Sequence, residues 1–210
     1  MDNMSLLVEH KLNDAMGILA RVVTEMSCGE ALEFQHAFNL DVTEAEYEEL
    51  IRAKTGSLIG AATELGATLN GGGRSKARGP AYRRFGEKIG VAFQIVDDLF
   101  DYLSDSEVTG KPVGSDLAEG KVTLPLIAAL RQATQADRKR LRALAGRRKW
   151  SRGQWTDLCA LIERAGGFEY SRRRAAALAA EARSLLAREP KGAARTALDA
   201  AIDYAVNRDH

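Results

Sequence analysis

Three aspartates stand close together in the segment QIVDDLFD, residues 94–101, whose other residues are mostly those of a buried helix. Like charges at this spacing repel one another, and burying them without partners is costly. Carboxylate oxygens on a rigid helix suit a hard divalent cation, Mg²⁺ above all. The pattern of Asp97, Asp98 and Asp101 therefore leaves two interpretations open, a metal site and an ordinary solvated helix face.

The helical periodicity of this segment predicts that the acids need not enter the core. At about 100° per residue, apolar and polar side chains separate onto two sides of one helix. The apolar side comprises Ile89, Ala92, Phe93, Val96, Leu99, Phe100 and Leu103. The polar side comprises Glu87, Gln94, Asp98, Asp101 and Asp105, with Asp97 at its edge. This polar stripe itself carries no lysine or arginine, so we expect something positive from elsewhere to meet it.

Three lysines supply candidate partners for an anion. Lys111 and Lys121 each follow a glycine shortly after the acids, and Lys54 lies mid-helix among small residues in IRAKTGSLIGAA. A lysine ammonium is a compact charge that suits phosphate oxygens. Lys54 could instead keep its head group at the surface or reach into a cavity. Metal-binding acids and lysines together could hold a diphosphate, and without a P-loop or Rossmann fingerprint an isoprenoid diphosphate is favoured over a nucleotide.

The elements that must position these residues are predicted to be helices, because strand signals are nearly absent. Helices are expected over about 5–38, over 43–69 with Thr43 and Glu46 as a capping box, and over 81–103. A further helix is expected to start near EGKVTLPLI. The glycine-rich stretch 70–80 and the polar stretch 104–116 are predicted to be loops. No linker divides residues 1–210, so the prediction is one all-α domain.

Composition argues against a disulfide-bonded, a membrane-spanning and a nucleic-acid-binding protein. The chain has 210 residues, a net charge of +1, and two distant cysteines in no metal or redox spacing, which indicates a reducing compartment. Charged residues interrupt the N-terminal segment, so we expect no transmembrane span and a cytoplasmic protein. Residues 131–195 contain 17 Lys and Arg but 6 Asp and Glu. Solvated helix faces are favoured there over a nucleic-acid surface, because the basic residues are interspersed and no nucleic-acid motif accompanies them.

An ordered set of motifs resembles the trans-isoprenyl (polyprenyl) diphosphate synthases. FQIVDDLFDY followed by GKPVGSDLAEGKVTLPLI resembles their second aspartate-rich region, and RAKTGSLIGAATELGA resembles their helix with a Lys-Thr pair. GEALEFQ resembles the preceding helix, and YAVNRDH resembles the family's C-terminus. The resemblance covers nearly the whole chain in the right order. It implies an all-α, isoprenoid-synthase-type helical bundle in which residues 1–210 form part of a single polyprenyl synthetase domain.

The resemblance also implies roles. Asp97, Asp98 and Asp101 would bind Mg²⁺ that bridges to an allylic prenyl diphosphate, which Lys54, Lys111 and Lys121 would also contact. Thr55 and Gln94 would line the reaction centre, and Arg208 would help to bind the second substrate, isopentenyl diphosphate. The Mg²⁺ and the lysines would neutralise the leaving diphosphate, so that the isopentenyl double bond can attack an allylic cation.

One part of the family pattern is missing. Family members extend further at the N-terminus, where a first aspartate-rich motif would stand, so an N-terminally truncated bundle is expected. The chain could be a fragment, a gene model begun at an internal methionine, or a subunit completed by another chain. We expect a homodimer or heteromer that is inactive alone. The alternatives are a non-catalytic or complementing subunit of a heteromeric synthase, a terpene cyclase on the same bundle, and an arginine-rich nucleic-acid binder.

Overall fold

The computed structural model describes residues 3–69, 73–103 and 114–207, and these residues form helices and turns without a strand. The prediction of an all-α chain is thus confirmed for the described residues. The elements are α1 (Asn3–Glu9), α2 (Asn13–His36), α3 (Glu44–Ile51), the π-helical turn η1 (Arg52–Gly56), α4 (Ser57–Leu69), α5 (Gly73–Leu103), α7 (Ser115–Glu119), α8 (Leu124–Gln132), α9 (Gln135–Ala145), α10 (Arg152–Arg164), α11 (Gly167–Leu186) and α12 (Ala193–Asn207).

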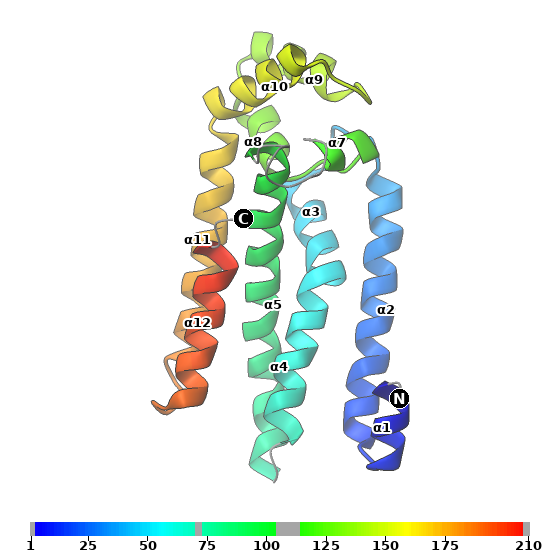
Figure 1. The fold of residues 1–210 in the computed structure, drawn as a ribbon, viewed down its shortest axis with the longest axis vertical. Helices are drawn as coiled ribbons and strands as arrows, with labels where there is room; N and C mark the ends of the chain where they lie inside the picture. The colour runs from blue at the N-terminus through cyan, green and yellow to red at the C-terminus, as the bar shows by residue number, and fades with distance from the viewer. Residues whose placement is uncertain (1–2, 70–72, 104–113, 208–210) are drawn as a thin grey trace.

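The long helices stand side by side as an elongated bundle (Figure 1). α5 lies at its centre and packs against α4 and α11, while α2 stands at one edge and α12 at the other. The helices α9 and α10 lie across one end, close to α8, and α7 lies at the same end near the C-terminus of α2. This end, with its short helices and connections, holds most of the residues singled out in the sequence.

Several predicted elements can be compared with the structure. The loop expected over 104–116 is wrong at Ser115 and Asp116, which begin α7, and its residues 104–113 lie outside the described residues. The capping box at Thr43 and Glu46 is confirmed, because each side chain accepts a hydrogen bond from the other's backbone N–H. The single helix expected over 5–38 is wrong, because it divides into α1 and α2 at a turn where Lys11 has φ 55°. The loop expected over 70–80 is wrong from Gly73 onward, where α5 begins. Gly79 is buried against the end of α4, and this packing offsets the low helix propensity of the neighbouring Pro80.

The largest apolar cluster surrounds the upper half of α5. Its members come from α3, α5 and every helix from α7 to α11, including the fully buried Ile95, Leu124, Leu126, Leu158 and Ile162. A smaller cluster joins α5 to α11 and α12, and a third, around Ile18, Val22 and Ala61, joins α2 to α4. The helix with the aspartates is therefore held on several sides, whereas α2 has a smaller apolar contact.

Glycines bring η1 and α5 close together. A Cβ atom added at Gly90 of α5 would lie 2.7 Å from the Cα atom of Gly56 at the end of η1. No larger residue fits such a contact without a shift of the backbones. The small residues after Lys54 therefore allow close packing, and this contact sets the η1 turn directly against the aspartate-bearing helix α5.

Candidate functional site

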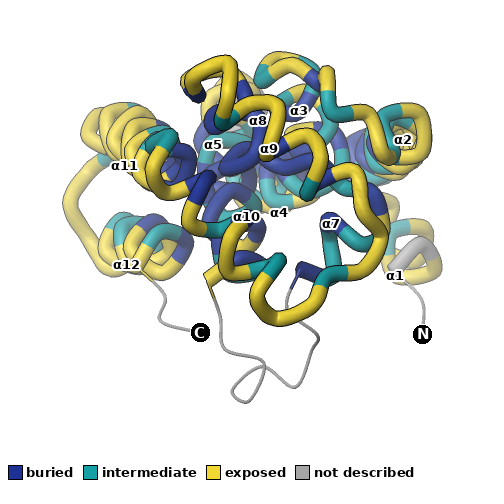
Figure 2. The backbone as a smooth tube through the Cα atoms, turned by 90° about the horizontal axis from the view of Figure 1, so that it is seen from above, coloured by how far each residue is buried: buried dark blue, intermediate teal, exposed yellow. Residues whose placement is uncertain are grey.

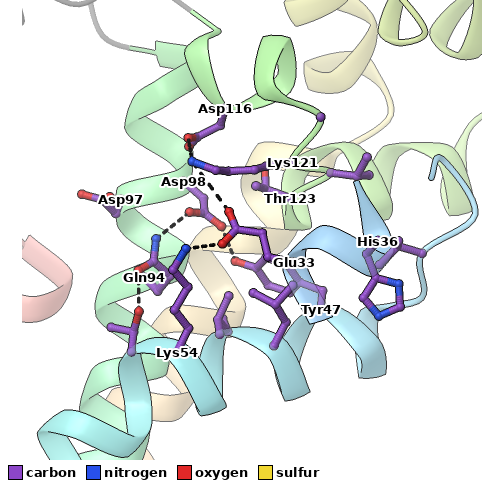
Figure 3. Close-up of a pocket in the computed structure, with 16 residues that line it drawn as sticks. Glu33, His36, Tyr47, Lys54, Gln94, Asp97, Asp98, Asp116, Lys121 and Thr123 are labelled. Carbon is purple, nitrogen blue, oxygen red and sulfur yellow. Dashed lines mark hydrogen bonds and ion pairs between the residues drawn. The ribbon is translucent and has the colours of Figure 1, made fainter. Parts of the chain in front are cut away.

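A pocket of about 280 Å³ opens where α2, α3, η1, α5 and the α7–α8 connection meet (Figure 3). Residues from four separate stretches of sequence thus converge on one cavity. Its lining comprises Glu33, His36, Val42, Tyr47, Leu50, Ile51, Lys54, Thr55, Gln94, Asp97, Asp98, Asp116, Gly120, Lys121, Val122 and Thr123. Four of these side chains are carboxylates and two are lysines, so the pocket carries excess acid.

Asp98 does not lie on a solvated face, and the prediction that the acids need not be buried is wrong for this residue. It is 4% exposed, whereas Asp97 is exposed and Asp101 is half-buried. The helical wheel failed because α3 covers this part of α5 and brings Tyr47 against the carboxylate. In Figure 3, Asp97 and Asp98 point to different sides of α5. Leu103, expected on the apolar side, is 44% exposed.

Hydrogen bonds compensate the burial of Asp98. The Tyr47 hydroxyl donates to Asp98 Oδ2 at 2.6 Å, and Gln94 Nε2 donates to Asp98 Oδ1 at 2.8 Å. Thr55 Oγ1 donates to Gln94 Oε1 at 2.9 Å, which extends the chain of contacts to η1. Burial raises the pKa of Asp98 to about 7, against the opposing effect of the bonds from Tyr47 and Gln94. The Asp98 carboxyl group is therefore poised between its neutral and charged forms near neutral pH.

Lys54 and Lys121 approach one another across Glu33 of α2. Lys54 Nζ contacts the Glu33 carboxylate and lies 3.2 Å from Glu30 Oε1, while Lys121 Nζ lies 3.8 Å from Glu33 Oε1. Figure 3 shows both ammonium groups directed toward Glu33. Each lysine side chain is about one-third exposed, so neither cation is sealed from solvent. Lys54 therefore lines the cavity, and its side chain stays partly exposed to solvent.

The lysines are held in their charged forms. Burial lowers the pKa of Lys54, but the Glu33 and Glu30 carboxylates raise it overall. The pKa of Lys121 is also raised, because Glu119 and Asp116 outweigh the effect of burial. Their oxygens lie 2.9 and 3.1 Å from the Lys121 Nζ atom. Two cations therefore stand in a pocket whose other charged lining residues are four acids, and the two ammonium groups can bind an anion.

The π-helical turn explains how two neighbouring residues of η1 reach the pocket. Lys54 and Thr55 both lie within η1, where the extra residue of a π turn alters the directions of side chains relative to an α-helix. Such turns occur frequently at functional sites. Thr55 contacts Gln94, while Lys54 reaches Glu33 of α2.

Asp101 lies one turn beyond the pocket lining and joins α5 to α7. Its carboxylate accepts hydrogen bonds from Ser115 Oγ at 2.8 Å and from the Asp116 backbone N–H at 3.2 Å. Burial raises the pKa of Asp101, and the nearby Asp116 charge raises it further. Asp101 therefore fixes the start of α7, from which Asp116 enters the pocket.

No group of three or more His, Cys, Asp or Glu side chains among the described residues is arranged to enclose a metal ion by itself. A Mg²⁺ ion, however, usually keeps several waters and binds through one or two carboxylates plus substrate phosphates. Asp97 is exposed and lines the pocket, so its carboxylate suits an ion shared with a phosphate ligand, whereas Asp98 and Asp101 already accept hydrogen bonds at both oxygens.

Six of the residues predicted from sequence line the same pocket: Lys54, Thr55, Gln94, Asp97, Asp98 and Lys121. Lys111, Arg208 and Asp105 lie outside the described residues. Sequence reasoning missed Glu33, Tyr47 and Asp116. Glu33 and Asp116 stand within the quoted stretches GEALEFQ and GKPVGSD, so the motifs could have indicated them. Tyr47 carried no signal, because only the packing of α3 against α5 brings it to Asp98.

The described ranges include no helix that is both long and apolar enough to cross a bilayer.

Comparisons with known proteins agree with this architecture. The family profile described as "Polyprenyl synthetase" matches residues 2–162. The chain is 37% identical over 199 residues to the short chain isoprenyl diphosphate synthase of Methanothermobacter thermautotrophicus, which covers 95% of this chain and 60% of that protein. It is 35% identical over 196 residues to the nonaprenyl diphosphate synthase of Mycobacterium tuberculosis, with 93% and 57% covered.

Solved structures give the same answer for the fold. The polyprenyl synthase of Caulobacter crescentus, crystallised with calcium and isoprenyl diphosphate, superposes with a TM-score of 0.88 at 35% identity. That match covers 98% of this chain and 62% of the other, so the chain spans about 60% of the length of its relatives. Profile, sequence identity and superposition together show that the chain belongs to the polyprenyl synthetase family and has its all-helical isoprenoid synthase fold.

Proposed function

We propose that this chain is part of a polyprenyl diphosphate synthase and binds the allylic prenyl diphosphate together with Mg²⁺. The observation that carries the proposal is the meeting of Lys54 and Lys121, from distant parts of the sequence, beside the Asp97–Asp98 helix in one pocket. The calcium and isoprenyl diphosphate held by the related Caulobacter protein support the same ligand chemistry.

Asp97, Asp98 and Asp101 are the proposed Mg²⁺ ligands. Asp97 offers an exposed carboxylate, whereas Asp98 and Asp101 also hold Tyr47 and Ser115 and so fix the geometry of α5 against α3 and α7. Bound Mg²⁺ would neutralise charge on the diphosphate as its C–O bond breaks. Without a dication, the four carboxylates of the lining would repel a diphosphate more than its two lysines attract it.

Lys54 and Lys121 are the proposed diphosphate contacts. The Glu33 carboxylate stands between them, and an incoming diphosphate oxygen would compete with it for both ammonium groups. Thr55 and Gln94 are proposed to line the reaction centre, where their oxygens can stabilise an allylic cation. The electrons of the breaking C–O bond leave with the diphosphate. The isopentenyl double bond then forms the new C–C bond, and a proton is lost.

The remaining assignments rest on the family resemblance. Lys111 is proposed as a third diphosphate contact and Arg208 as a contact of isopentenyl diphosphate. Residues 1–210 are proposed to act as one partial domain within a cytoplasmic homodimer or heteromer. Because the chain spans about 60% of its relatives' length, elongation by the chain alone is not expected. The same observation favours a second candidate, a complementing subunit of a heteromeric synthase.

A paired measurement tests this proposal. Calorimetry with Mg²⁺ and a non-hydrolysable prenyl diphosphate analogue should show binding. Lys54→Gln and Lys121→Gln should each weaken it about 10- to 100-fold, as expected for a lost charged hydrogen bond. Lys88→Gln, which removes a cation of α5 that pairs with Glu181 instead, should leave the affinity unchanged.

Turnover distinguishes the remaining outcomes. The chain alone should not lengthen an allylic diphosphate with labelled isopentenyl diphosphate, and elongation by it would overturn the claim of inactivity. Absence of analogue binding would overturn the site itself. If Asp97→Ala and Lys121→Ala left an assembled complex with a partner synthase fully active, a purely non-catalytic subunit would be the correct interpretation.

A further inference from the structure

A cluster of exposed cations covers the end of the bundle formed by α9 and its connection to α10. We call the six exposed side chains of this cluster the end patch: Lys139, Arg140, Arg147, Arg148, Lys149 and Arg152. Within the described part of the chain, none of the six lies within ion-pair distance of a carboxylate. Residues 138–156 contain no Asp or Glu, although the whole chain has a net charge of only +1.

The neighbouring basic residues make ion pairs and backbone hydrogen bonds, and none of these is found for the end patch among the described residues. Arg138 donates to the backbone carbonyls of Leu130 and Ala133 at the C-terminus of α8. Arg142 pairs with Asp41, and Arg164 pairs with Asp137 at 2.5 Å. The interspersed basic residues expected from sequence therefore separate into two groups. One group holds the bundle together, and the end patch is left facing solvent.

Aromatic contacts attach the end patch firmly to the aspartate helix. Trp150 Nε1 donates to the Leu144 carbonyl at 2.8 Å and its ring lies 5.4 Å from that of Trp155. Trp155 stacks on Tyr102 of α5 at 5.6 Å, next to Asp101. The turn that carries Arg147, Arg148 and Lys149 is thus fixed relative to the site. Figure 2 shows this end of the molecule, with the α9–α10 connection largely exposed.

The end patch also adjoins the pocket. The guanidinium of Arg148 lies 4.3 Å from the centroid of the Phe38 ring, which is itself 46% exposed. The Phe38 backbone N–H donates to the Gly120 carbonyl at 2.8 Å, and Gly120 lines the pocket. Cations and an exposed aromatic ring therefore occur together beside the cavity.

We infer that the end patch docks the protein on an anionic phospholipid surface. Each Lys or Arg close to an anionic leaflet strengthens binding about fivefold. Six exposed cations, for which the described residues provide no ion pair, therefore form an electrostatic anchor on a nearly neutral chain. The half-exposed Phe38 suits the headgroup boundary, where apolar side chains such as Phe can insert. A nucleic acid fits less well, because four of the six cations lie on a turn or at the start of α10 and not along a helix that could enter a groove.

Vesicle co-sedimentation of the full chain, without substrate, tests this inference independently of any catalytic activity. The probes are phosphatidylcholine vesicles and vesicles with about a quarter phosphatidylglycerol, at about 0.1 M salt, where electrostatic attraction persists. Arg140, Arg147 and Lys149 are changed to Gln together, which leaves the contact of Arg148 with Phe38 intact. The matched control changes Lys11, Arg188 and Lys191 to Gln, which are exposed residues of the α1–α2 and α11–α12 connections at the opposite end of the bundle.

The unaltered chain should sediment with anionic and not with neutral vesicles, and added salt should release it. The end-patch variant should bind anionic vesicles on the order of 100-fold more weakly, and the control variant should bind like the unaltered chain. Equal binding to both vesicle types, or an equal loss in the two variants, would overturn the inference. A short DNA duplex that binds more tightly than the vesicles at the same salt would replace it with a nucleic-acid surface.

Discussion

At the scale of single residues, Asp98 is the side chain whose environment differs most from that expected of an aspartate. Burial raises its pKa to about 7, while Tyr47 and Gln94 donate one hydrogen bond to each oxygen. The free energy of burying the carboxylate is thus partly offset by these bonds. The site tolerates its row of acids because one of them can be neutral when no cation is near.

The raised pKa predicts a pH dependence of stability in the metal-free chain. The folded state binds the Asp98 proton more tightly than the unfolded state does, because the ordinary pKa of an aspartate side chain is 3.8. The contribution of this proton to the free energy of unfolding is therefore fully present below about pH 4 and is lost as the pH rises through 7. Between about pH 5 and 8 the loss should be about 2 to 3 kcal/mol, at 1.36 kcal/mol per pKa unit.

Urea unfolding across this pH range, with EDTA present, measures the effect. Asp98→Asn cannot titrate, so its free energy of unfolding should fall less than that of the unaltered chain over the same interval. Parallel curves for the two proteins would show that Asp98 does not titrate as proposed.

At the scale of elements, the site depends on how closely α2 approaches η1. A Cβ atom added at Gly29 would lie 2.7 Å from the Lys54 backbone nitrogen. Gly29 lies beside Glu30 and one turn before Glu33, the two acids that contact Lys54. A glycine of α2 therefore sets the position of both acidic partners of the lysine.

Gly29→Ala should force α2 away from η1 and destabilise the fold by about 1 to 3 kcal/mol, as overpacked contacts do. Binding of the diphosphate analogue should weaken with it. Gly17→Ala on the same helix is the matched control, because nothing lies within 4 Å of its added Cβ atom. This control should be neutral or stabilising by up to about 1 kcal/mol. Equal effects of the two changes in thermal unfolding and calorimetry would count against the role given to Gly29.

A second contact of α2 is an ion-pair network centred on Arg83 of α5. Its guanidinium lies 2.5 Å from Glu25 of α2, 3.2 Å from Glu64 of α4 and 2.9 Å from Glu87 one turn away. The Arg83 side chain is 15% exposed, so the charges are largely removed from water. Arg21 also pairs with Glu64 at 2.9 Å, so loss of Arg83 would leave Glu64 one cation. The same loss would remove the cation that Glu25 and Glu87 share.

Arg83→Gln should lower the free energy of unfolding by about 3 kcal/mol, because three carboxylates lose their shared cation. The exposed neighbour Arg84 is the control, and Arg84→Gln should change the free energy of unfolding by less than about 0.5 kcal/mol. Chemical denaturation of both variants measures the difference. A loss no larger than that of the Arg84 variant would show that the network contributes little.

Sequence patterns predicted the helical elements better than the contacts between them. The capping box at Thr43 and the convergence of Lys54, Gln94 and Lys121 in one cavity agree with local motifs. The burial of Asp98 was not predictable from a helical wheel, because a wheel does not show which helix covers a face. The start of α5 was mispredicted for the same reason, since packing against α4 outweighs the low helix propensity of glycine and proline.

At the scale of the whole molecule, the charges are unevenly distributed. The pocket is lined by four carboxylates and two lysines, although the chain as a whole is nearly neutral. A diphosphate entering this pocket without a counter-cation would meet net repulsion. The proposed function therefore requires that a dication and the diphosphate bind together, with each increasing the affinity for the other.

The most direct test is the affinity of a non-hydrolysable prenyl diphosphate analogue, measured by calorimetry with Mg²⁺ and again with EDTA. The analogue should bind at least about tenfold more tightly with Mg²⁺, a coupling of about 1.4 kcal/mol. Asp97→Asn should remove most of that difference. Equal affinities in Mg²⁺ and in EDTA would contradict the account.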